Sequence, residues 1–250
     1  MATQGIPGCS RSRAGMAGRY VTMLGLMLGL FALCGPDGAA AAEPATVIPP
    51  PAADDAASGI ALRSVVLAGG CFWGIQAVYQ HVEGVHQAVS GYAGGVAPNP
   101  SYEQVSSGRT GYAESVEVTF DPRKISLGKI LQIFFSVAHD PTQLNRQGPD
   151  VGTQYRSAIF YSDESAKRVA QSYISQLGRT SVFGRPMVTR IDPLTKFYPA
   201  EAYHQDYALT HPDSPYIEYV DLPKVENLMR LFPDIYRAKP VTVAAMARRP

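Results

Sequence analysis

The residues best suited to carry out a chemical reaction lie in the short stretch AGGCFWG, at positions 68–74. Cys71 follows two glycines, precedes the bulky Phe72 and Trp73, and comes directly after the apolar run SVVLA at 64–68. Apolar residues at helical spacing predict a helix that opens at Cys71, where unpaired backbone N–H groups and the helix dipole favour a thiolate. The two aromatics could wall an apolar pocket. We therefore interpret Cys71 as a candidate nucleophile with a lowered pKa, the alternative being a small buried core residue.

The chain has only two other cysteines, Cys9 and Cys34, and both lie in a segment with the order of a secretory signal peptide. Basic residues precede the apolar run VTMLGLMLGLFALCG at 21–35, and small residues offering an A-x-A site follow it. We predict that residues 1–42 are a signal peptide or, if uncleaved, a membrane anchor, because the run is near the lower length limit of a spanning helix. The protein is then exported, periplasmic or otherwise extracytoplasmic. Removal of the segment would leave Cys71 as the only thiol, which excludes a disulfide within the mature chain.

Beyond this segment the sequence predicts a disordered Pro/Ala-rich linker over 43–62, one domain over 63–238 and a flexible tail over 239–250. Strands and helices interleave in the domain, with several long loops between them. The expected strands cover 64–68, 85–95, 113–120, 155–161 and 187–191, and the expected helices cover 71–82, 126–138, 163–177 and part of 222–236. This pattern predicts an α+β fold, a two-layer α/β sandwich with helices packed on a mostly antiparallel or mixed central sheet, in the manner of a ferredoxin-like plait.

One carboxyl is placed by strand alternation alone. In AESVEVTF, at 113–120, Glu114 shares parity with Val116 and Val118, so we expect its side chain to point inward. Glu117 has the opposite parity and should point to solvent. A carboxyl that faces a core should have a raised pKa, because burial disfavours its charged form.

Net charge and histidine spacing argue against a nucleic-acid-binding protein and against a metal site. The chain has 22 Lys and Arg against 21 Asp and Glu, a net charge of +1, which argues against a nucleic-acid partner. The five histidines lack the spacing of metal ligands, so no metal site is predicted.

Six blocks carry a resemblance to a known family: GGCFWG, GYAGG, NPSYEQV, SGRTGYAESVEV, HDPTQLNRQGPDVGTQYRSAIFY and AEAYHQDY. In this order and spacing they closely resemble peptide methionine sulfoxide reductase A, from about Val65 to Tyr236. The resemblance implies reduction of methionine sulfoxide, expected for the S epimer, in proteins and as the free amino acid. Cys71 would attack the sulfoxide sulfur, release methionine and retain a sulfenic acid.

The resemblance also implies roles for the other site residues. Glu114 matches the family's acid and must stay protonated, while Tyr102 and Tyr155 match the phenols that bind the sulfoxide oxygen. Phe72 and Trp73 would enclose the substrate's S-methyl group.

Two further residues keep open alternatives. Asp150 corresponds to a family active-site carboxylate, although Pro-Asp-x-Gly is also an ordinary turn sequence. His204 lies in a family motif, where a structural hydrogen-bonding role is the alternative we favour.

The chain departs from many family members because no cysteine follows Cys71, and Ser106 and Ser107 stand where some relatives have another cysteine. An external thiol must then resolve the sulfenic acid: thioredoxin, glutaredoxin, glutathione or a similar reductant. We expect no bound cofactor, oxidised methionine-containing proteins and a thiol reductant as partners, and a monomer.

Three other functions compete with this interpretation. Cys71 could serve a thiol hydrolase with His139, His204 or His211 as its base. A thiol peroxidase would be expected to carry Arg or Thr beside the sulfur, and neither flanks Cys71. A protein that binds oxidised methionine without turnover would form no sulfenic acid.

Overall fold

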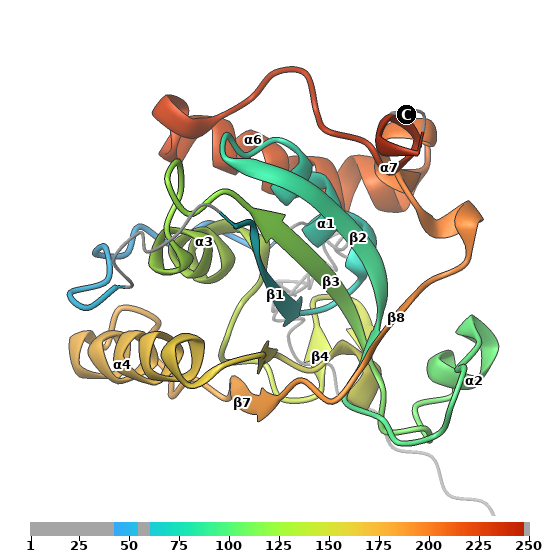
Figure 1. The fold of residues 1–250 in the computed structure, drawn as a ribbon, viewed down its shortest axis with the longest axis horizontal. Coiled ribbons are helices and arrows are strands. Elements are labelled where there is room, and N and C mark those ends of the chain that lie inside the picture. Colours follow the sequence, from blue (N-terminus) through green and yellow to red (C-terminus); the bar gives the residue numbers. More distant parts are fainter. Residues whose placement is uncertain (1–42, 55–60, 248–250) are drawn as a thin grey trace, which may run out of the picture. The chain divides into compact units, whose positions relative to one another are not determined.

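The computed structural model describes residues 43–54 and 61–247 (Figure 1). The predicted signal peptide or anchor over 1–42 lies outside these residues, as do 55–60 of the predicted linker and the last three residues of the tail. Within the described residues, no helix combines the length and the apolar character that crossing a bilayer requires.

The centre of the fold is a six-stranded sheet in the order β7-β6-β1-β3-β2-β8. The strands are β1 (Arg63–Ala68), β2 (Val85–Ala93), β3 (Ala113–Phe120), β6 (Ala158–Tyr161), β7 (Arg190–Pro193) and β8 (Phe197–Pro199). A separate small ribbon pairs β4 (Arg146–Gln147) with β5 (Asp150–Val151). All pairs in the main sheet are antiparallel except β6 with β7. The order β6-β1-β3-β2, with α1 and α3 as its helices, is that of a ferredoxin-like βαββαβ unit, so the predicted α+β fold is confirmed.

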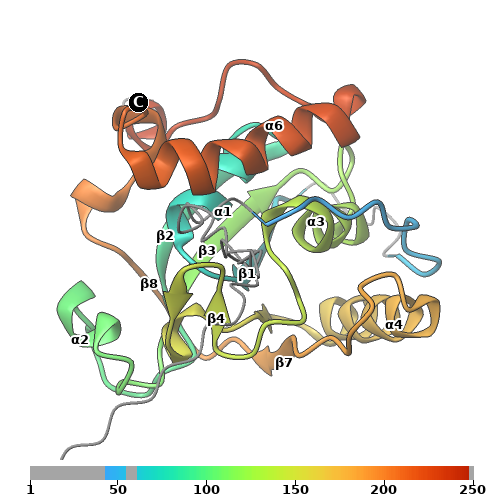
Figure 2. The ribbon, with the colours of Figure 1, turned by 180° about the vertical axis from the view of Figure 1, so that it is seen from behind.

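The helices gather around the curled sheet, as Figures 1 and 2 show from opposite sides. The α-helices are α1 (Phe72–Gln80), α2 (Tyr102–Ser106), α3 (Leu127–Ile133), α4 (Glu164–Thr180), α5 (Tyr207–Thr210), α6 (Leu222–Leu231) and α7 (Val243–Met246). Two π-helical turns, η1 (Phe134–Ala138) and η4 (Ile217–Asp221), extend α3 and precede α6, and 3₁₀ turns cover η2 (Thr153–Tyr155), η3 (Ala202–His204) and η5 (Pro233–Ile235).

Strand alternation divides the apolar residues between two faces of the sheet. Val65 and Leu67 of β1 pack with α1, α3, α4 and α6 in the main core, whereas Val66 and Ala68 join a smaller cluster on the opposite face. Because apolar residues cover both faces, the second face is not open to water. Glu117, expected in solvent, is therefore half-buried, and burial raises its pKa.

Capping side chains fix where the two helices that flank the core begin. Ser126 accepts a hydrogen bond from the Lys129 N–H at 3.1 Å at the start of α3. Asp163 accepts one from the Ala166 N–H at 2.8 Å at the start of α4. The predicted helix over 126–138 is thus present, although its second half winds as a π-helix.

Residues 43–54 differ from the predicted disordered linker. They form a strap along η1 and α4: the Thr46 N–H donates to the Ser136 carbonyl at 2.8 Å, and the Tyr173 hydroxyl donates to the Pro49 carbonyl at 2.7 Å. Ile48 is buried in the main core. Pro/Ala-rich composition indicated disorder, but these backbone groups find partners on the helices.

The predicted flexible tail also differs in part. Its residues 243–246 form α7, and the Val243 N–H donates to the Asp206 carboxylate at 3.0 Å.

Candidate active site

Cys71 lies where β1 passes into α1, at the N-cap position of the helix. The turn depends on Gly70, whose φ of +97° lies in the left-handed region and where a Cβ atom would come within 2.7 Å of the Gln147 side chain. Only 8% of the Cys71 surface is exposed. The position of Cys71 at the start of a helix is as the sequence predicts, but the residue is buried.

The protonation of Cys71 differs from the prediction. Burial raises the pKa of the thiol well above its ordinary value, and the negative fields of Asp221 and Glu114 add to the effect. A backbone N–H, that of Trp73, lowers the pKa as expected for a helix start, but it does not offset the desolvation. The prediction of a thiolate at the helix N-terminus is wrong for the resting site, which holds a neutral thiol.

Glu114 lies on β3, directly opposite Tyr92 of β2, and only 1% of it is exposed. Its Oε2 accepts a hydrogen bond from the Phe72 N–H at 3.1 Å, so the carboxyl sits beside the residue that follows Cys71. Burial raises the pKa of Glu114 to about 8, with smaller contributions from Asp150 and Asp221. The inward orientation predicted from strand parity is confirmed, and the group is mostly protonated at neutral pH.

Tyr102 and Tyr155 approach the same site from two separate turns. Tyr102 opens α2, its N–H bonds the Glu201 carboxylate at 2.9 Å, and its ring stacks on Phe72 with centroids 6.5 Å apart. Burial raises the pKa of both phenols, and the fields of Glu114 and Cys71 raise them further. Both hydroxyls therefore stay protonated and can donate hydrogen bonds.

Asp150 also reaches the site, from β5. Its Oδ2 accepts a hydrogen bond from the Tyr216 hydroxyl at 2.5 Å, and burial raises its pKa. A narrow cavity brings it together with the sulfur; its lining includes Cys71, Gln147, Asp150, Tyr216, Lys224 and Glu43. The Asp150 carboxyl therefore lies at the same site as the Cys71 thiol.

An aromatic wall stands next to the sulfur. Phe72 is fully buried, whereas Trp73 is partly exposed and stacks on Tyr207 with centroids 3.9 Å apart. The Trp73 indole N–H donates to His204 Nδ1 at 3.3 Å, and His204 also packs against Tyr102 with ring centroids 4.3 Å apart. His204 thus orients the tryptophan, which matches the structural role that the sequence favours for it.

The histidines proposed as alternative bases are otherwise engaged. His139 contacts the Ser157 hydroxyl through Nε2 and the Phe134 carbonyl through Nδ1, and burial lowers its pKa to about 4. His211 is exposed and stacks on Tyr207. In the described part of the chain, no His, Cys, Asp or Glu cluster could hold a metal ion.

Sequence reasoning missed a buried ion pair at this site. Lys224 Nζ lies 3.1 Å from Asp221 Oδ1, and both side chains are almost completely buried. Their i, i+3 spacing at a predicted helix start was a usable signal, but only the tertiary structure brings them beside α1.

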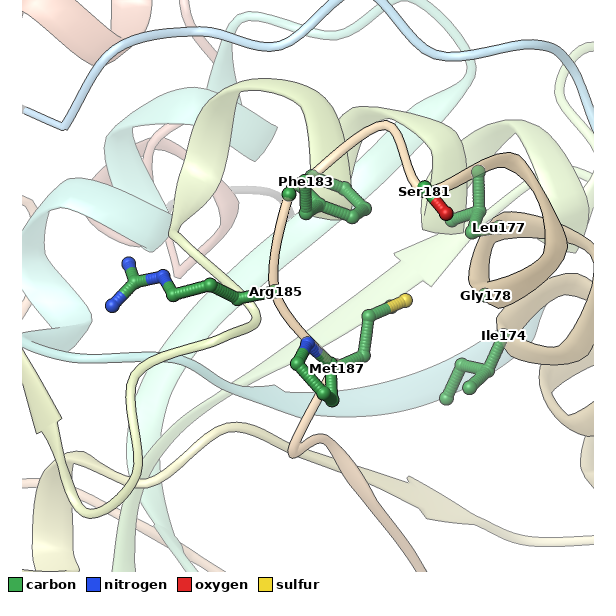
Figure 3. Close-up of a pocket in the computed structure, with 9 residues that line it drawn as sticks. Ile174, Leu177, Gly178, Ser181, Phe183, Arg185 and Met187 are labelled. Atoms are coloured by element: carbon green, nitrogen blue, oxygen red, sulfur yellow. The ribbon is translucent and has the colours of Figure 1, made fainter.

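Figure 3 shows a second and larger cavity, of about 390 Å³, between the end of α4 and the loop that follows it. Ile174, Leu177, Phe183 and Met187 line it, and its lining contains no thiol, carboxyl or imidazole group. Size therefore does not identify the reactive site, because Cys71 lines the narrow cavity and not this larger one.

Comparisons with known proteins agree with this geometry. The family model described as peptide methionine sulfoxide reductase matches residues 63–234. The MsrA 2 peptide methionine sulfoxide reductase of Mesorhizobium japonicum is 57% identical over 181 residues, which cover 72% of this chain and 93% of the relative. The MsrA enzyme of Deinococcus radiodurans is 50% identical over 179 residues, covering 72% and 86%.

Two solved structures share the fold. Mxr1 from Saccharomyces cerevisiae in its reduced form matches with a TM-score of 0.55 and 34% identity, covering 61% of this chain and 87% of that one. Methionine sulfoxide reductase A of Corynebacterium diphtheriae matches with a TM-score of 0.53 and 33% identity, covering 68% and 85%. From the extent of the family match and the identity to its relatives, we conclude that this chain belongs to the peptide methionine sulfoxide reductase A family.

Proposed function

We propose that this protein reduces methionine sulfoxide to methionine, with Cys71 as nucleophile and Glu114 as acid. The observation that carries the proposal is a buried thiol beside a carboxyl whose pKa is raised to about 8 and which accepts a hydrogen bond from the N–H of Phe72, the residue after Cys71. A sulfoxide oxygen leaves poorly unless it is protonated, and Glu114 holds a proton at the pH where the reaction must run.

The reaction balances without a bound cofactor. Cys71 attacks the sulfoxide sulfur while Glu114 gives its proton to the oxygen, and the two phenols of Tyr102 and Tyr155 hydrogen-bond that oxygen. The oxygen ends on Cys71 as a sulfenic acid, methionine leaves, and the original thiol proton restores the Glu114 carboxyl. The sulfur of methionine is reduced by two electrons and the sulfur of Cys71 is oxidised by two.

Substrate recognition follows from the aromatic wall. Trp73, partly exposed and fixed by Tyr207 and His204, offers a flat apolar surface for the S-methyl group, whose burial contributes about 0.8 kcal/mol. We expect this wall and the phenols to select the S epimer, and we expect methionine sulfoxide in proteins to be the main substrate. We propose that the protein acts as a monomer.

Regeneration requires a thiol from outside the chain. No cysteine follows Cys71 in the sequence, and Ser106 and Ser107 cap their own helix by bonding the Tyr102 and Gln104 carbonyls. A thioredoxin, glutaredoxin, glutathione or similar thiol would form a mixed disulfide with Cys71 and release water. A second thiol would then release the enzyme as a thiol.

We also propose that the protein works outside the cytoplasm. The basic residues, the apolar run over 21–35 and the small residues after it support export by a signal peptide that is cleaved or kept as an anchor. Cell fractionation combined with N-terminal sequencing tests this, and an intact N-terminus in the cytoplasmic fraction would refute it.

The activity is tested with the full chain, methionine sulfoxide and dithiothreitol. A Cys9→Ser/Cys34→Ser variant keeps Cys71 as its sole thiol and should produce methionine at the wild-type rate. Cys71→Ser should produce none. If the double variant loses turnover, another cysteine takes part in the cycle and the single-thiol mechanism is wrong.

A further inference from the structure

The buried pair formed by Asp221 and Lys224 packs directly on the first turn of α1. A Cβ atom at Gly74 would collide with the Asp221 carboxylate and would lie 2.9 Å from Lys224 Nζ. Gly74 is three residues after Cys71, so the absence of a side chain there lets both charges approach the helix start that carries the sulfur. Lys224 also lines the same narrow cavity as Cys71.

Asp221 is only half satisfied. Its Oδ1 pairs with Lys224 at 3.1 Å, whereas its Oδ2 is buried without a hydrogen-bond partner among the described residues. The side chain of Asp221 is 0% exposed. An unpartnered carboxylate oxygen at such depth costs stability, so its presence at the nucleophile calls for a role other than stabilising the fold.

Charged and titratable groups face Cys71 from every element packed around it. They are Glu114 on β3, Asp150 and Tyr155 from β5 and η2, Tyr102 on α2, Tyr216 before η4, Asp221 and Lys224 at the start of α6, and Glu43 on the strap. Glu114 is mostly protonated at neutral pH, and Lys224 is the only basic side chain in this set. Among the charged groups, Asp221 opposes ionisation of Cys71 most strongly, and Lys224 acts in the opposite direction.

We propose that Asp221 is a positioning residue for the proton of Cys71: paired with Lys224, its carboxylate adds to the effect of burial in keeping the thiol protonated in the resting enzyme, and Lys224 limits this contribution. The thiolate is the form that peroxides and other oxidants attack, so a protonated Cys71 resists oxidation until substrate enters. This protects the one thiol of the domain, which has no neighbouring cysteine to rescue it. The inference rests on Cys71 being the reactive thiol of the proposed function.

The test measures alkylation of Cys71 by iodoacetamide against pH, with the ultraviolet absorbance of the thiolate as a second readout. To leave Cys71 as the only thiol, all variants are made in the Cys9→Ser/Cys34→Ser protein. Asp221→Asn should lower the midpoint of the pH profile by about one unit and speed alkylation near neutral pH about tenfold. Loss of the thiol to hydrogen peroxide should accelerate by a similar factor.

The rate at high pH, where Cys71 is fully ionised, separates this effect from local opening of the fold. An electrostatic effect moves the midpoint and leaves the plateau rate nearly unchanged, whereas opening of the site raises the plateau. Asp121→Asn is the matched control, because Asp121 is also buried and paired with a basic side chain, Arg123, at 2.7 Å, but it does not act on Cys71. Its midpoint should equal that of the unchanged protein.

The double variant Asp221→Asn/Lys224→Met removes both charges and should give a midpoint between those of the unchanged protein and Asp221→Asn. An unchanged midpoint in Asp221→Asn, or a change confined to the plateau, would overturn the proposal. So would a double variant whose midpoint lies at or above that of the unchanged protein. None of these assays uses a sulfoxide, so failure here leaves the reductase proposal to its own test.

Discussion

Replacing Glu114 with Gln should slow the enzyme and stabilise its fold at neutral pH. Glu114 has its pKa raised from 4.5 to about 8 by burial, so the folded protein holds a proton that the unfolded chain releases. A carboxyl whose pKa is raised by folding destabilises the fold as the pH increases from its unfolded-state pKa to its folded-state pKa. An ion-paired carboxylate, whose pKa is lowered by folding, has the opposite effect. Gln keeps the shape and the oxygen that accepts the Phe72 N–H, but it cannot ionise in either state.

The size of the effect follows from the shift. At pH 7 Glu114 is ionised in the unfolded chain and mostly protonated in the folded one. Because pH 7 lies about 2.5 units above the unfolded pKa and each unit corresponds to roughly 1.4 kcal/mol, ionisation favours the unfolded chain by about 3 kcal/mol. Near pH 4 both states hold the proton, so the difference falls to a few tenths of a kcal/mol. Glu114→Gln should therefore raise the free energy of unfolding by about 3 kcal/mol at pH 7 and hardly at all at pH 4.

Urea unfolding at a series of pH values measures this difference, and single-turnover methionine release measures the chemistry. We expect the release step to slow by about 10²- to 10⁴-fold, the usual contribution of a positioned acid. The reasoning is refuted if the difference in unfolding free energy between variant and wild type is the same at pH 7 and pH 4, because Glu114 would then be ionised in the fold. Lower stability at pH 7 would show instead that Glu114 is a structural ion.

Four further substitutions test other parts of the structure. Gly70→Ala forces a side chain into a left-handed turn against Gln147, so methionine formation should drop and urea unfolding should show a loss of about 1–3 kcal/mol; unchanged stability would contradict the strained turn. Tyr173→Phe removes the bond to the strap and should cost about 1 kcal/mol in the same assay, whereas a disordered strap predicts no change. Ser106→Ala and Ser107→Ala should leave turnover with dithiothreitol or thioredoxin unchanged, and slower recycling in either would reveal an overlooked part in resolution.

The sequence was sufficient for the elements whose patterns are local. Alternation in 113–120 placed Glu114 on the inner face of β3, and the strand–Gly-Gly–Cys order placed Cys71 at the start of α1. The order of the strands and helices predicted an α+β fold. These features depend on neighbouring residues, so periodicity and turn chemistry suffice to find them.

The features that sequence missed depend on contacts between distant segments. The pKa of Cys71 rises mainly because the thiol is buried and also because Asp221, at the end of η4, packs against α1, and neither fact is encoded near Cys71 itself. The strap over 43–54 has a composition typical of disorder, yet its backbone is held by η1 and α4. Likewise, the aromatic partner of Trp73 is Tyr207, far along the chain.

The most direct test of the account is one turnover without reductant. The protein is mixed with the S and R epimers of peptide methionine sulfoxide separately, while methionine released and free thiol lost are counted and dimedone traps any sulfenic acid. We predict one methionine per protein from the S epimer, with a single dimedone adduct on Cys71. No methionine from either epimer, with the Cys71 thiol intact, would contradict the reductase mechanism and leave a protein that binds oxidised methionine without turning it over.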